Sequence, residues 1–323
     1  MNLHSTDQTV LQTAIKWLKE GHQVALVTVA KTWGSAPRPC GSLLIMREDG
    51  THIGSVSGGC VEEDLVARYQ RHQLSTSLPT SINYGVNRED ALRFGLPCGG
   101  RLELIVEALS ATAPLQALLD TINLGHTVIR KLCLTTGEVS LHKCSSPATA
   151  INEFSYTDHN VIKAFGPTWQ ILLIGAGHLS HYVANIALMF DYGITVCDPR
   201  EDYQRSWLLE GVGFTQHMPD DAVSLLGCHQ RSIVLTLTHD PKLDDMALME
   251  ALQHNLFFVG ALGSMRSTEK RRERLLKLGI SQRQLSRLHA PVGLAIGSRT
   301  PPEIAVSIMA ELTATRNNTP ISL

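Results

Sequence analysis

The sequence predicts an α/β protein, with a small N-terminal mixed α/β domain followed by a C-terminal Rossmann-like domain with a parallel sheet. From Trp169 onward, short apolar strand patterns alternate with helical patterns, which is typical of a parallel sheet covered on both faces. Earlier in the chain, two strand patterns flank Glu48-Asp49-Gly50, which predicts an antiparallel hairpin. The length of 323 residues is sufficient for two domains.

We expect the N-terminal domain to occupy residues 1–112. Gly21 ends the first predicted helix, and Gly34, Pro37 and Pro39 indicate a loop after the strand that follows. The expected elements, in chain order, are a helix at 8–20, strands at 23–30, 42–47 and 51–56, a helix at 61–72 and a strand at 101–108.

Residues 113–166 are expected to connect the two domains and to include one candidate β-hairpin. A short helix is predicted at 114–122, and strand patterns at 127–134 and 138–142 are close enough to pair with each other. Residues 144–168 have no strong period, so they are interpreted as a linker.

The C-terminal domain is expected at residues 167–323. Thr300 to Glu303 form a capping-box pattern that begins an apolar helix at 304–312, which we interpret as structural. The other expected elements are strands at 169–174, 194–197, 233–237 and 256–259 and a helix at 178–190.

Composition limits the classes of function. A hydrophobic content of 43% with 18% charged residues predicts a packed globular chain. The net charge of −2 and an aromatic content of 5% give no reason to expect a nucleic-acid partner. Residues 1–9 do not have the pattern of a signal peptide, and no apolar run is long enough to span a membrane. Seven cysteines without a C-x-x-C pair argue against a disulfide framework or a zinc ribbon, so a cytoplasmic protein is expected.

The first candidate site is Ser57-Gly58-Gly59-Cys60, where a strand pattern changes to a helix pattern. A thiol at a helix N-terminus faces the positive end of the peptide dipoles, which favours a nucleophile or a soft-metal ligand. Gly58 and Gly59 would let an anionic ligand approach the backbone closely. The alternative is a small core cysteine after a tight turn.

Two further N-terminal segments fit with this site. Cys98-Gly99-Gly100 repeats the glycine and cysteine combination in reverse order, and the segment from Trp33 to Arg38 offers a guanidinium for an anion. Each segment also has an ordinary interpretation as a turn. If they converge, Cys60 and Cys98 would line one pocket, with Arg38 beside it.

The C-terminal domain has a partial dinucleotide fingerprint. Gly175-Ala176-Gly177-His178 follows a strand and begins a helix, with Ser180 in place of the third glycine. Asp198 ends the next strand, where an acid can bind a ribose hydroxyl. The pattern predicts a Rossmann fold, with either a bound nucleotide or phosphate ligand or a fold that has lost its ligand. His178 either faces the ligand crevice or caps the helix.

A third glycine loop, Leu262 to Ser267, precedes a helix rich in basic residues. We interpret Arg266, at the helix start, as a phosphate ligand. The remaining basic residues of the helix are interpreted as a solvated face. His239, Asp240 and Asp244 follow a buried strand, at the sheet edge where ligands bind, and each alone is a weak signal.

These motifs, in this order, resemble the XdhC/CoxI family, the accessory factors of xanthine dehydrogenase and related molybdenum hydroxylases. The matching segments extend from the N-terminal domain to the last helix. They are Gly34–Arg38, Gly54–Glu62, Cys98–Gly100, Gly175–His178, Asp198–Arg200, Thr238–Asp240, Gly260–Ser264, His289–Gly293 and Gly297–Ile308. One departure is Cys40, which is either a third pocket thiol or an irrelevant replacement.

The resemblance implies a chaperone that binds molybdenum cofactor (molybdopterin), protects its sulfurated form and passes it to apo-xanthine dehydrogenase or a related hydroxylase. On this basis we hypothesise that Cys60 and Cys98 contact the metal, whereas Arg38 and amides near Gly58 and Gly59 hold the pterin phosphate. A cysteine desulfurase and a homodimeric partner are further expectations. Members of the family are often labelled as the dehydrogenase itself, but this chain lacks the cysteine spacing of iron–sulfur clusters.

Two other functions remain open from the sequence. Gly175, Gly177 and Asp198 also fit an NAD(P)-dependent oxidoreductase, although no proton donor or substrate pocket can be named. The other alternative is a scaffold between a sulfurase and the hydroxylase that binds no small ligand.

Overall fold

The computed structural model describes residues 6–34, 38–74, 77–85, 100–144, 153–226 and 230–319. Its contacts divide the chain into two compact units, the N-terminal unit (residues 4–166) and the C-terminal unit (residues 167–323). Within the described residues, no helix has the length and apolar character that crossing a membrane would require.

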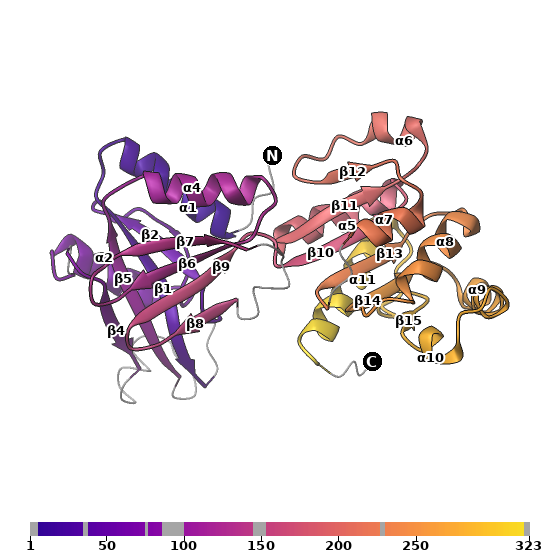
Figure 1. The fold of residues 1–323 in the computed structure, drawn as a ribbon. Coiled ribbons are helices and arrows are strands. Elements are labelled where there is room, and N and C mark those ends of the chain that lie inside the picture. The colour runs from indigo at the N-terminus through magenta and orange to yellow at the C-terminus, as the bar shows by residue number, and fades with distance from the viewer. Residues whose placement is uncertain are drawn as a thin grey trace. The chain divides into compact units, whose positions relative to one another are not determined.

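The N-terminal unit is built on a five-stranded antiparallel sheet (Figure 1). β1 is the central strand and pairs with β2 on one side and β5 on the other. The strand order is β3-β2-β1-β5-β4, with β1 at Val24–Trp33, β2 at Leu43–Arg47, β3 at His52–Gly54, β4 at Thr80–Tyr84 and β5 at Arg101–Leu109.

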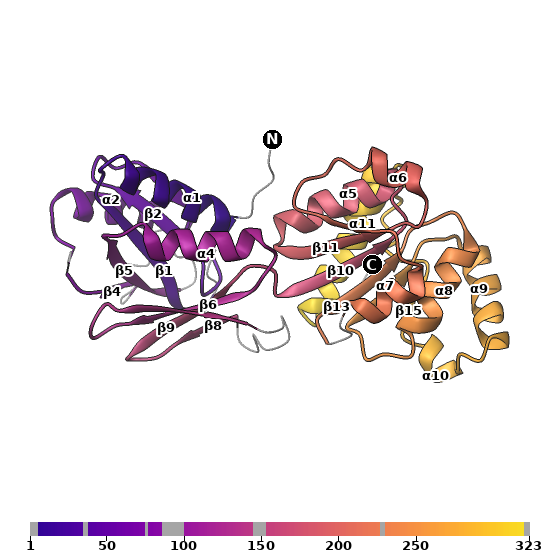
Figure 2. The ribbon, with the colours of Figure 1, turned by 45° about the horizontal axis from the view of Figure 1, so that its top comes forward.

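Helices cover both faces of this sheet because its central strands are apolar on both sides. The helix α2 (Cys60–Gln70) buries Val61 and Leu65 against one face. The helices α1 (Thr6–Lys19) and α4 (Ala113–Asn123) share a core with residues from the other face and lie side by side (Figure 2).

A second, four-stranded antiparallel sheet completes the unit. β6 (Val128–Cys133) and β7 (Val139–Lys143) form the expected hairpin. The linker expected at 144–168 is wrong for part of its length, because β8 (Phe154–Tyr156) and β9 (Asn160–Phe165) lie there and pair with each other. These strands are short and only partly apolar, and β9 gains its stability by pairing with β6.

A buried ion pair connects the two sheets of the N-terminal unit. Arg130 on β6 donates to both carboxylate oxygens of Glu107 on β5, over 2.9 and 2.6 Å. Both side chains are less than a tenth exposed. Such a pair stabilises the fold only while both partners are present, since either one alone would be an uncompensated buried charge.

The C-terminal unit contains a six-stranded parallel sheet, as predicted. Its order, β12-β11-β10-β13-β14-β15, is that of a Rossmann fold, with the switch in strand order between β10 and β13. The strands are β10 at Trp169–Ile174, β11 at Tyr192–Cys197, β12 at Gly213–Thr215, β13 at Ser232–Thr236, β14 at Phe258–Ala261 and β15 at Leu288–His289.

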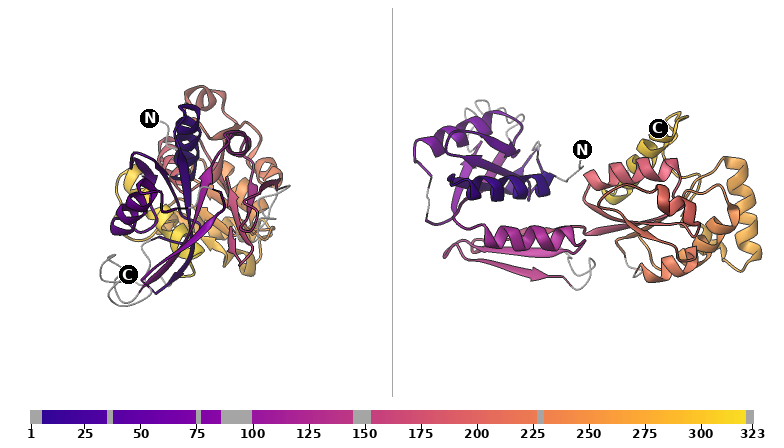
Figure 3. Two further views of the ribbon diagram at one scale, coloured as in Figure 1. Left: turned by 90° about the vertical axis from the view of Figure 1, so that its left-hand side faces the viewer. Right: turned by 90° about the horizontal axis from the view of Figure 1, so that it is seen from above.

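Alternate residues of β10 belong to different cores. Ile171 and Leu173 pack in the core shared with α5 and α11, whereas Leu172 and Ile174 pack in the core of α7, α8 and α9. Figure 3 shows helices on both faces of the sheet. The helices are α5 at His178–Met189, α6 at Glu201–Ser206, α7 at Pro219–Leu225, α8 at Pro241–Ala251, α9 at Met265–Lys277, α10 at Gln282–Leu285 and α11 at Pro301–Arg316.

Candidate functional site

The loop between β3 and α2 is organised around one carboxylate, that of Glu62. Glu62 lies in the first turn of α2 and is only 4% exposed. It accepts six hydrogen bonds from the loop. The donors to Oε1 are Ser55 Oγ (2.9 Å) and the amides of Val56 (2.9 Å), Ser57 (2.8 Å) and Gly58 (3.0 Å), and the donors to Oε2 are Ser57 Oγ and the amide of Gly59 (2.9 Å).

These bonds determine the charge state of Glu62. Burial alone would raise the pKa of its carboxyl, but the hydrogen bonds from Ser57, Gly58 and Gly59 outweigh that effect and lower the pKa well below its usual range. Glu62 is therefore an ionised internal anion at neutral pH, and it fixes the path of the loop that leads to Cys60.

The arrangement changes the role expected for Gly58 and Gly59. Their amides, expected to hold a phosphate, already donate to Glu62. Gly58 has φ +97°, and a Cβ on either glycine would meet nothing within 4 Å. In this conformation the two glycines therefore offer a ligand a left-handed turn and open space, because their amide N–H groups are already used within the protein. Cys60 begins α2 and its side chain is exposed, so it is not a core cysteine.

Arg38 lies beside this loop. Its Nε donates to Ser55 Oγ over 3.2 Å, and the same hydroxyl donates to Glu62. The rest of the Arg38 side chain is exposed. Cys40 is also exposed, with its sulfur 3.9 Å from Thr32 Oγ1. The structure thus brings together two of the predicted segments, through Arg38 and Ser55.

The described end of the Cys98–Gly100 segment, Gly100, approaches the segment from Trp33 to Arg38. Gly34 has φ +71°, and a Cβ on it would lie 3.5 Å from the Cα of Gly100. Trp33 and Arg101 are register partners in β1 and β5. Cys98 and Gly99 lie outside the described residues, so a pocket lined by both Cys60 and Cys98 remains a prediction. In the part of the chain that the structure describes, no three His, Cys, Asp or Glu residues gather as a metal site.

Sequence reasoning missed two features of this region. Glu62 was part of the motif but had no role assigned, although its position three residues after Gly59 is the spacing of a capping box. Trp33 was only part of a loop motif. It is 37% exposed and flanked by two cations, with Lys31 Nζ 5.4 Å and Arg101 Cζ 4.8 Å from its ring centroid.

In the C-terminal unit, the glycine loop after β10 has the geometry that its sequence predicts. Gly175 has φ +99°, and a Cβ there would lie 2.6 Å from Thr238 Cγ2. Ser180, in place of the third glycine, is fully buried and donates to the Gly175 carbonyl over 2.5 Å. At Gly177 a Cβ would meet nothing within 4 Å. His178 begins α5 with an exposed side chain, its ring 5.2 Å from that of Tyr182.

Asp198 is at the expected position, but its carboxylate is fully engaged within the protein. Oδ2 accepts from the Ala176 amide (2.9 Å) and from a terminal nitrogen of Arg200 (2.8 Å), and Oδ1 accepts from Arg200 Nε (2.8 Å). Burial would raise the pKa of Asp198, but the bonds from Arg200 and Ala176 prevail and lower it. The interpretation of Asp198 as an open ribose acceptor therefore does not describe this conformation.

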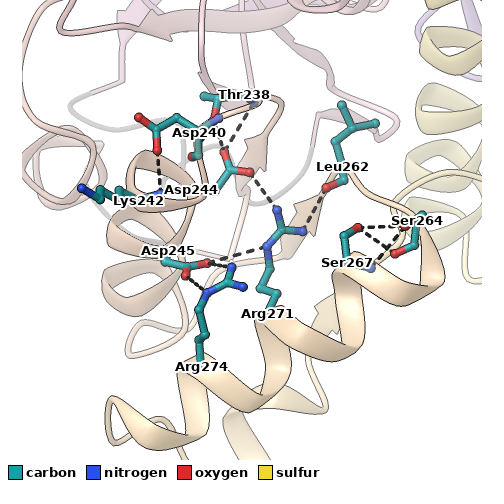
Figure 4. A network of polar contacts seen from close by, with 10 residues as sticks. All are labelled: Thr238, Asp240, Lys242, Asp244, Asp245, Leu262, Ser264, Ser267, Arg271 and Arg274. Atoms are coloured by element: carbon teal, nitrogen blue, oxygen red, sulfur yellow. Dashed lines mark hydrogen bonds and ion pairs between the residues drawn. The ribbon is translucent and has the colours of Figure 1, made fainter.

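The basic helix after the third glycine loop is not simply a solvated face (Figure 4). Arg271 is buried and donates to the Leu262 carbonyl (2.9 Å) and to Asp244 (2.8 Å). Arg274 pairs with Asp245 over 2.6 Å. The expectation fails because α9 packs beside α8, whose acidic residues the sequence alone could not place. Arg266 is exposed near the start of α9, as its interpretation as a phosphate ligand requires.

The polar residues after β13 have structural roles. Asp240 caps α8 by accepting from the Lys242 amide over 2.9 Å. Asp244 is 1% exposed and accepts from the Thr238 hydroxyl over 2.8 Å. Burial raises the pKa of Asp244 to about 6, although Thr238 and Arg271 both favour its ionised form. Only His239, of this group, has an exposed side chain without an assigned contact among the described residues.

Each of the two units matches a protein-family model. Residues 17–84 match the model described as "XdhC and CoxI family", and residues 171–312 match the model described as "XdhC Rossmann domain". Together the two matches span more than half of the chain. The chain belongs to the XdhC and CoxI family.

Curated relatives in this family match nearly the whole chain. The chain is 28% identical to the "Molybdenum cofactor insertion chaperone PaoD" of Escherichia coli (strain K12), over 96% of this chain and 88% of that protein. It is 27% identical to a protein of Bacillus subtilis (strain 168) that is named as a probable xanthine dehydrogenase subunit, over 93% of this chain and 95% of that protein.

A solved structure supports the fold of this XdhC and CoxI family member. The crystal structure titled as a xanthine dehydrogenase from Bacillus halodurans superposes with a TM-score of 0.72 and 24% sequence identity. The match covers 98% of this chain and 97% of that one. At this identity the likeness concerns the fold alone.

Proposed function

We propose that this protein is an accessory factor that binds molybdenum cofactor and inserts it into xanthine dehydrogenase or a related molybdenum hydroxylase. The observation that carries the proposal is the similarity, over 96% of the chain, to a relative named as a molybdenum cofactor insertion chaperone. The cofactor is the cargo of such a protein. In this proposal the protein acts as a cofactor chaperone, and none of its residues is given a catalytic role.

The N-terminal unit would hold the metal end of the cargo. Cys60 presents an exposed thiol at the first position of α2, beside the open space at Gly58 and Gly59. Soft sulfur ligands suit molybdenum chemistry. We assign Cys60 and Cys98 to the metal, and Gly99 to the cofactor-binding segment that contains Cys98.

Arg38 would hold the anionic phosphate of the pterin. Its guanidinium is anchored through Nε on Ser55, in the loop that ends at Cys60, and the remaining donors are exposed. A guanidinium is well suited to a phosphate because its N–H donors form a planar fork. The hydrogen bonds from this loop to Glu62 would fix the position of Arg38 relative to Cys60.

The C-terminal unit would bind the nucleotide or phosphate part of a ligand. Gly175 and Gly177 shape the loop at the switch point of the sheet, with His178 and Asp198 beside it and Arg266 at a second loop. The apo-hydroxylase is the proposed protein partner. A cysteine desulfurase and a second copy of this chain are further proposed partners, suggested by the role.

The test is cofactor analysis of the full chain purified from a host that makes molybdenum cofactor. We expect near-stoichiometric molybdenum and pterin, measured by metal analysis and by fluorescence of the oxidised pterin. An empty protein that oxidises NADH in a substrate-dependent manner would instead support the NAD(P)-dependent oxidoreductase. An empty protein that binds the hydroxylase would support the scaffold.

Variants test the thiol assignment separately. Cys60→Ala and Cys98→Ala should each lose most of the bound molybdenum. Cys133→Ala is the matched control, because Cys133 is a free cysteine of the same unit but lies on β6, in the other sheet. Full retention of molybdenum in both of the first two variants would refute the assignment.

A further inference from the structure

The residue pair Asp198–Arg200 bears on which nucleotide the C-terminal unit can take. In a Rossmann fold, an acid at the end of the second strand ordinarily receives the ribose hydroxyls of a dinucleotide. Here both oxygens of that acid accept from Arg200, and one also accepts from the Ala176 amide. A ribose could reach the carboxylate only by displacing the guanidinium.

Arg200 is held rigidly while part of it stays accessible. Two of its five N–H groups bind Asp198. Its Cζ lies 3.8 Å from the ring centroid of Tyr203, so the guanidinium is stacked as well as ion-paired. The side chain is 44% exposed, and among the described residues its remaining N–H donors have no further protein acceptor. A pre-positioned guanidinium loses little entropy when it binds a phosphate.

Arg200 also lies near the edge of the sheet where Rossmann folds bind their ligands. Asp198, to which it is bonded, accepts the amide of the glycine loop after β10. The pKa of Arg200 is raised, first by its hydrogen bonds to Asp198 and more weakly by Asp240, which follows β13. The guanidinium is therefore linked through Asp198 to the glycine loop that follows β10, the strand at which the strand order reverses.

We propose that Arg200 makes this crevice selective for an adenine dinucleotide with a phosphate on its ribose 2′ oxygen, over the same dinucleotide without that phosphate. The inference rests on the proposed nucleotide binding by the C-terminal unit. A 2′ phosphate would meet the outward N–H groups of Arg200. A 2′ hydroxyl finds the carboxylate that it needs already covered.

The experiment is a fluorescence titration of the full-length protein with NADPH and with NADH. Wild type should bind NADPH about ten- to a hundredfold more tightly, the range expected for one charge-assisted contact. Arg200→Ala should lose that preference through weaker NADPH binding, while its NADH affinity stays the same or rises because Asp198 is uncovered. Arg205→Ala is the matched control, because Arg205 is an exposed arginine of α6 that pairs only with Glu201 among the described residues, and it should keep the wild-type ratio.

Misfolding would lower both affinities together, so the ratio distinguishes it from loss of selectivity. Arg200→Lys keeps the charge without the fork and should give an intermediate ratio. Equal affinities in wild type, a preference for NADH, or no binding of either dinucleotide would overturn the inference. Molybdenum and pterin content, measured on the same preparation, tests the proposed function separately.

Discussion

Replacing Glu62 with glutamine tests whether one carboxylate holds the loop that presents Cys60. The substitution keeps the size of the side chain but turns one oxygen into an NH₂ group, which cannot accept from the Gly59 amide. The remaining acceptor is neutral. Hydrogen bonds to charged groups contribute about 1.5–3 kcal/mol, against about 0.5–1.5 kcal/mol for neutral ones.

The six bonds share one side chain, so their losses do not add independently. The bond from the Gly59 amide is lost, the Ser57 hydroxyl must turn to accept from the new NH₂ group, and the other bonds weaken, which gives an expected loss of local stability of about 3 kcal/mol. Hydrogen exchange of the amides from Val56 to Gly59 should then accelerate by about a hundredfold. Glu63→Gln is the matched control, since Glu63 is the next residue of α2 and is exposed. It should leave the exchange unchanged.

The same variant has a pH signature. Because the folded pKa of Glu62 is lowered, its contribution is fully present above the unfolded value of 4.5 and is lost as the pH falls below it. The free energy of unfolding, measured with urea, should be higher in wild type than in Glu62→Gln. That difference should shrink by about 1.4 kcal/mol for each pH unit below 4.5. Two results would refute the role given to Glu62. One is a Glu62→Gln variant whose amide exchange rates equal those of Glu63→Gln, and the other is a difference in free energy of unfolding that does not change with pH.

Four further variants test the packing within each unit. Gly175→Ala should destabilise the C-terminal unit by about 2 kcal/mol, because φ is +99° and the new Cβ would lie 2.6 Å from Thr238 Cγ2. Gly177→Ala, where a Cβ meets nothing, should stay within about 0.5 kcal/mol of wild type in urea unfolding. Arg130→Ala should cost the N-terminal unit about 3–5 kcal/mol by leaving Glu107 buried and unpaired. The double variant Arg130→Met with Glu107→Leu should recover most of that loss, and failure to recover would contradict the assigned cause.

The sequence was sufficient to predict the fold class because its strongest patterns are local. The strand at Trp169–Ile174, the glycine turn after it and the acid after β11 each follow from residues near one another in the chain. The prediction was least accurate at residues 144–168, because the sequences of β8 and β9 have little hydrophobic periodicity of their own. They are strands because β6 offers an edge to pair with, and a single segment does not contain that information.

The candidate sites were predictable in position but not in hydrogen bonding. Asp198 was placed correctly, yet nothing in its spacing indicates that Arg200 folds back onto it. The basic face of α9 could not be assigned either. Arg271 is buried because α8 presents Asp244 beside it, and that neighbour is set by helix packing.

Two of the three glycine loops use an internal carboxylate where the sequence suggests an external anion. Glu62 accepts the loop amides before Cys60, and Asp198 accepts an amide of the loop after β10. A phosphate entering either loop would compete with a buried, ionised side chain. Each carboxylate is instead linked to an arginine, Arg38 through Ser55 and Arg200 directly. Anion recognition by this protein would therefore depend on guanidinium groups that the loops position, so Arg38 and Arg200 are more informative targets than the glycines.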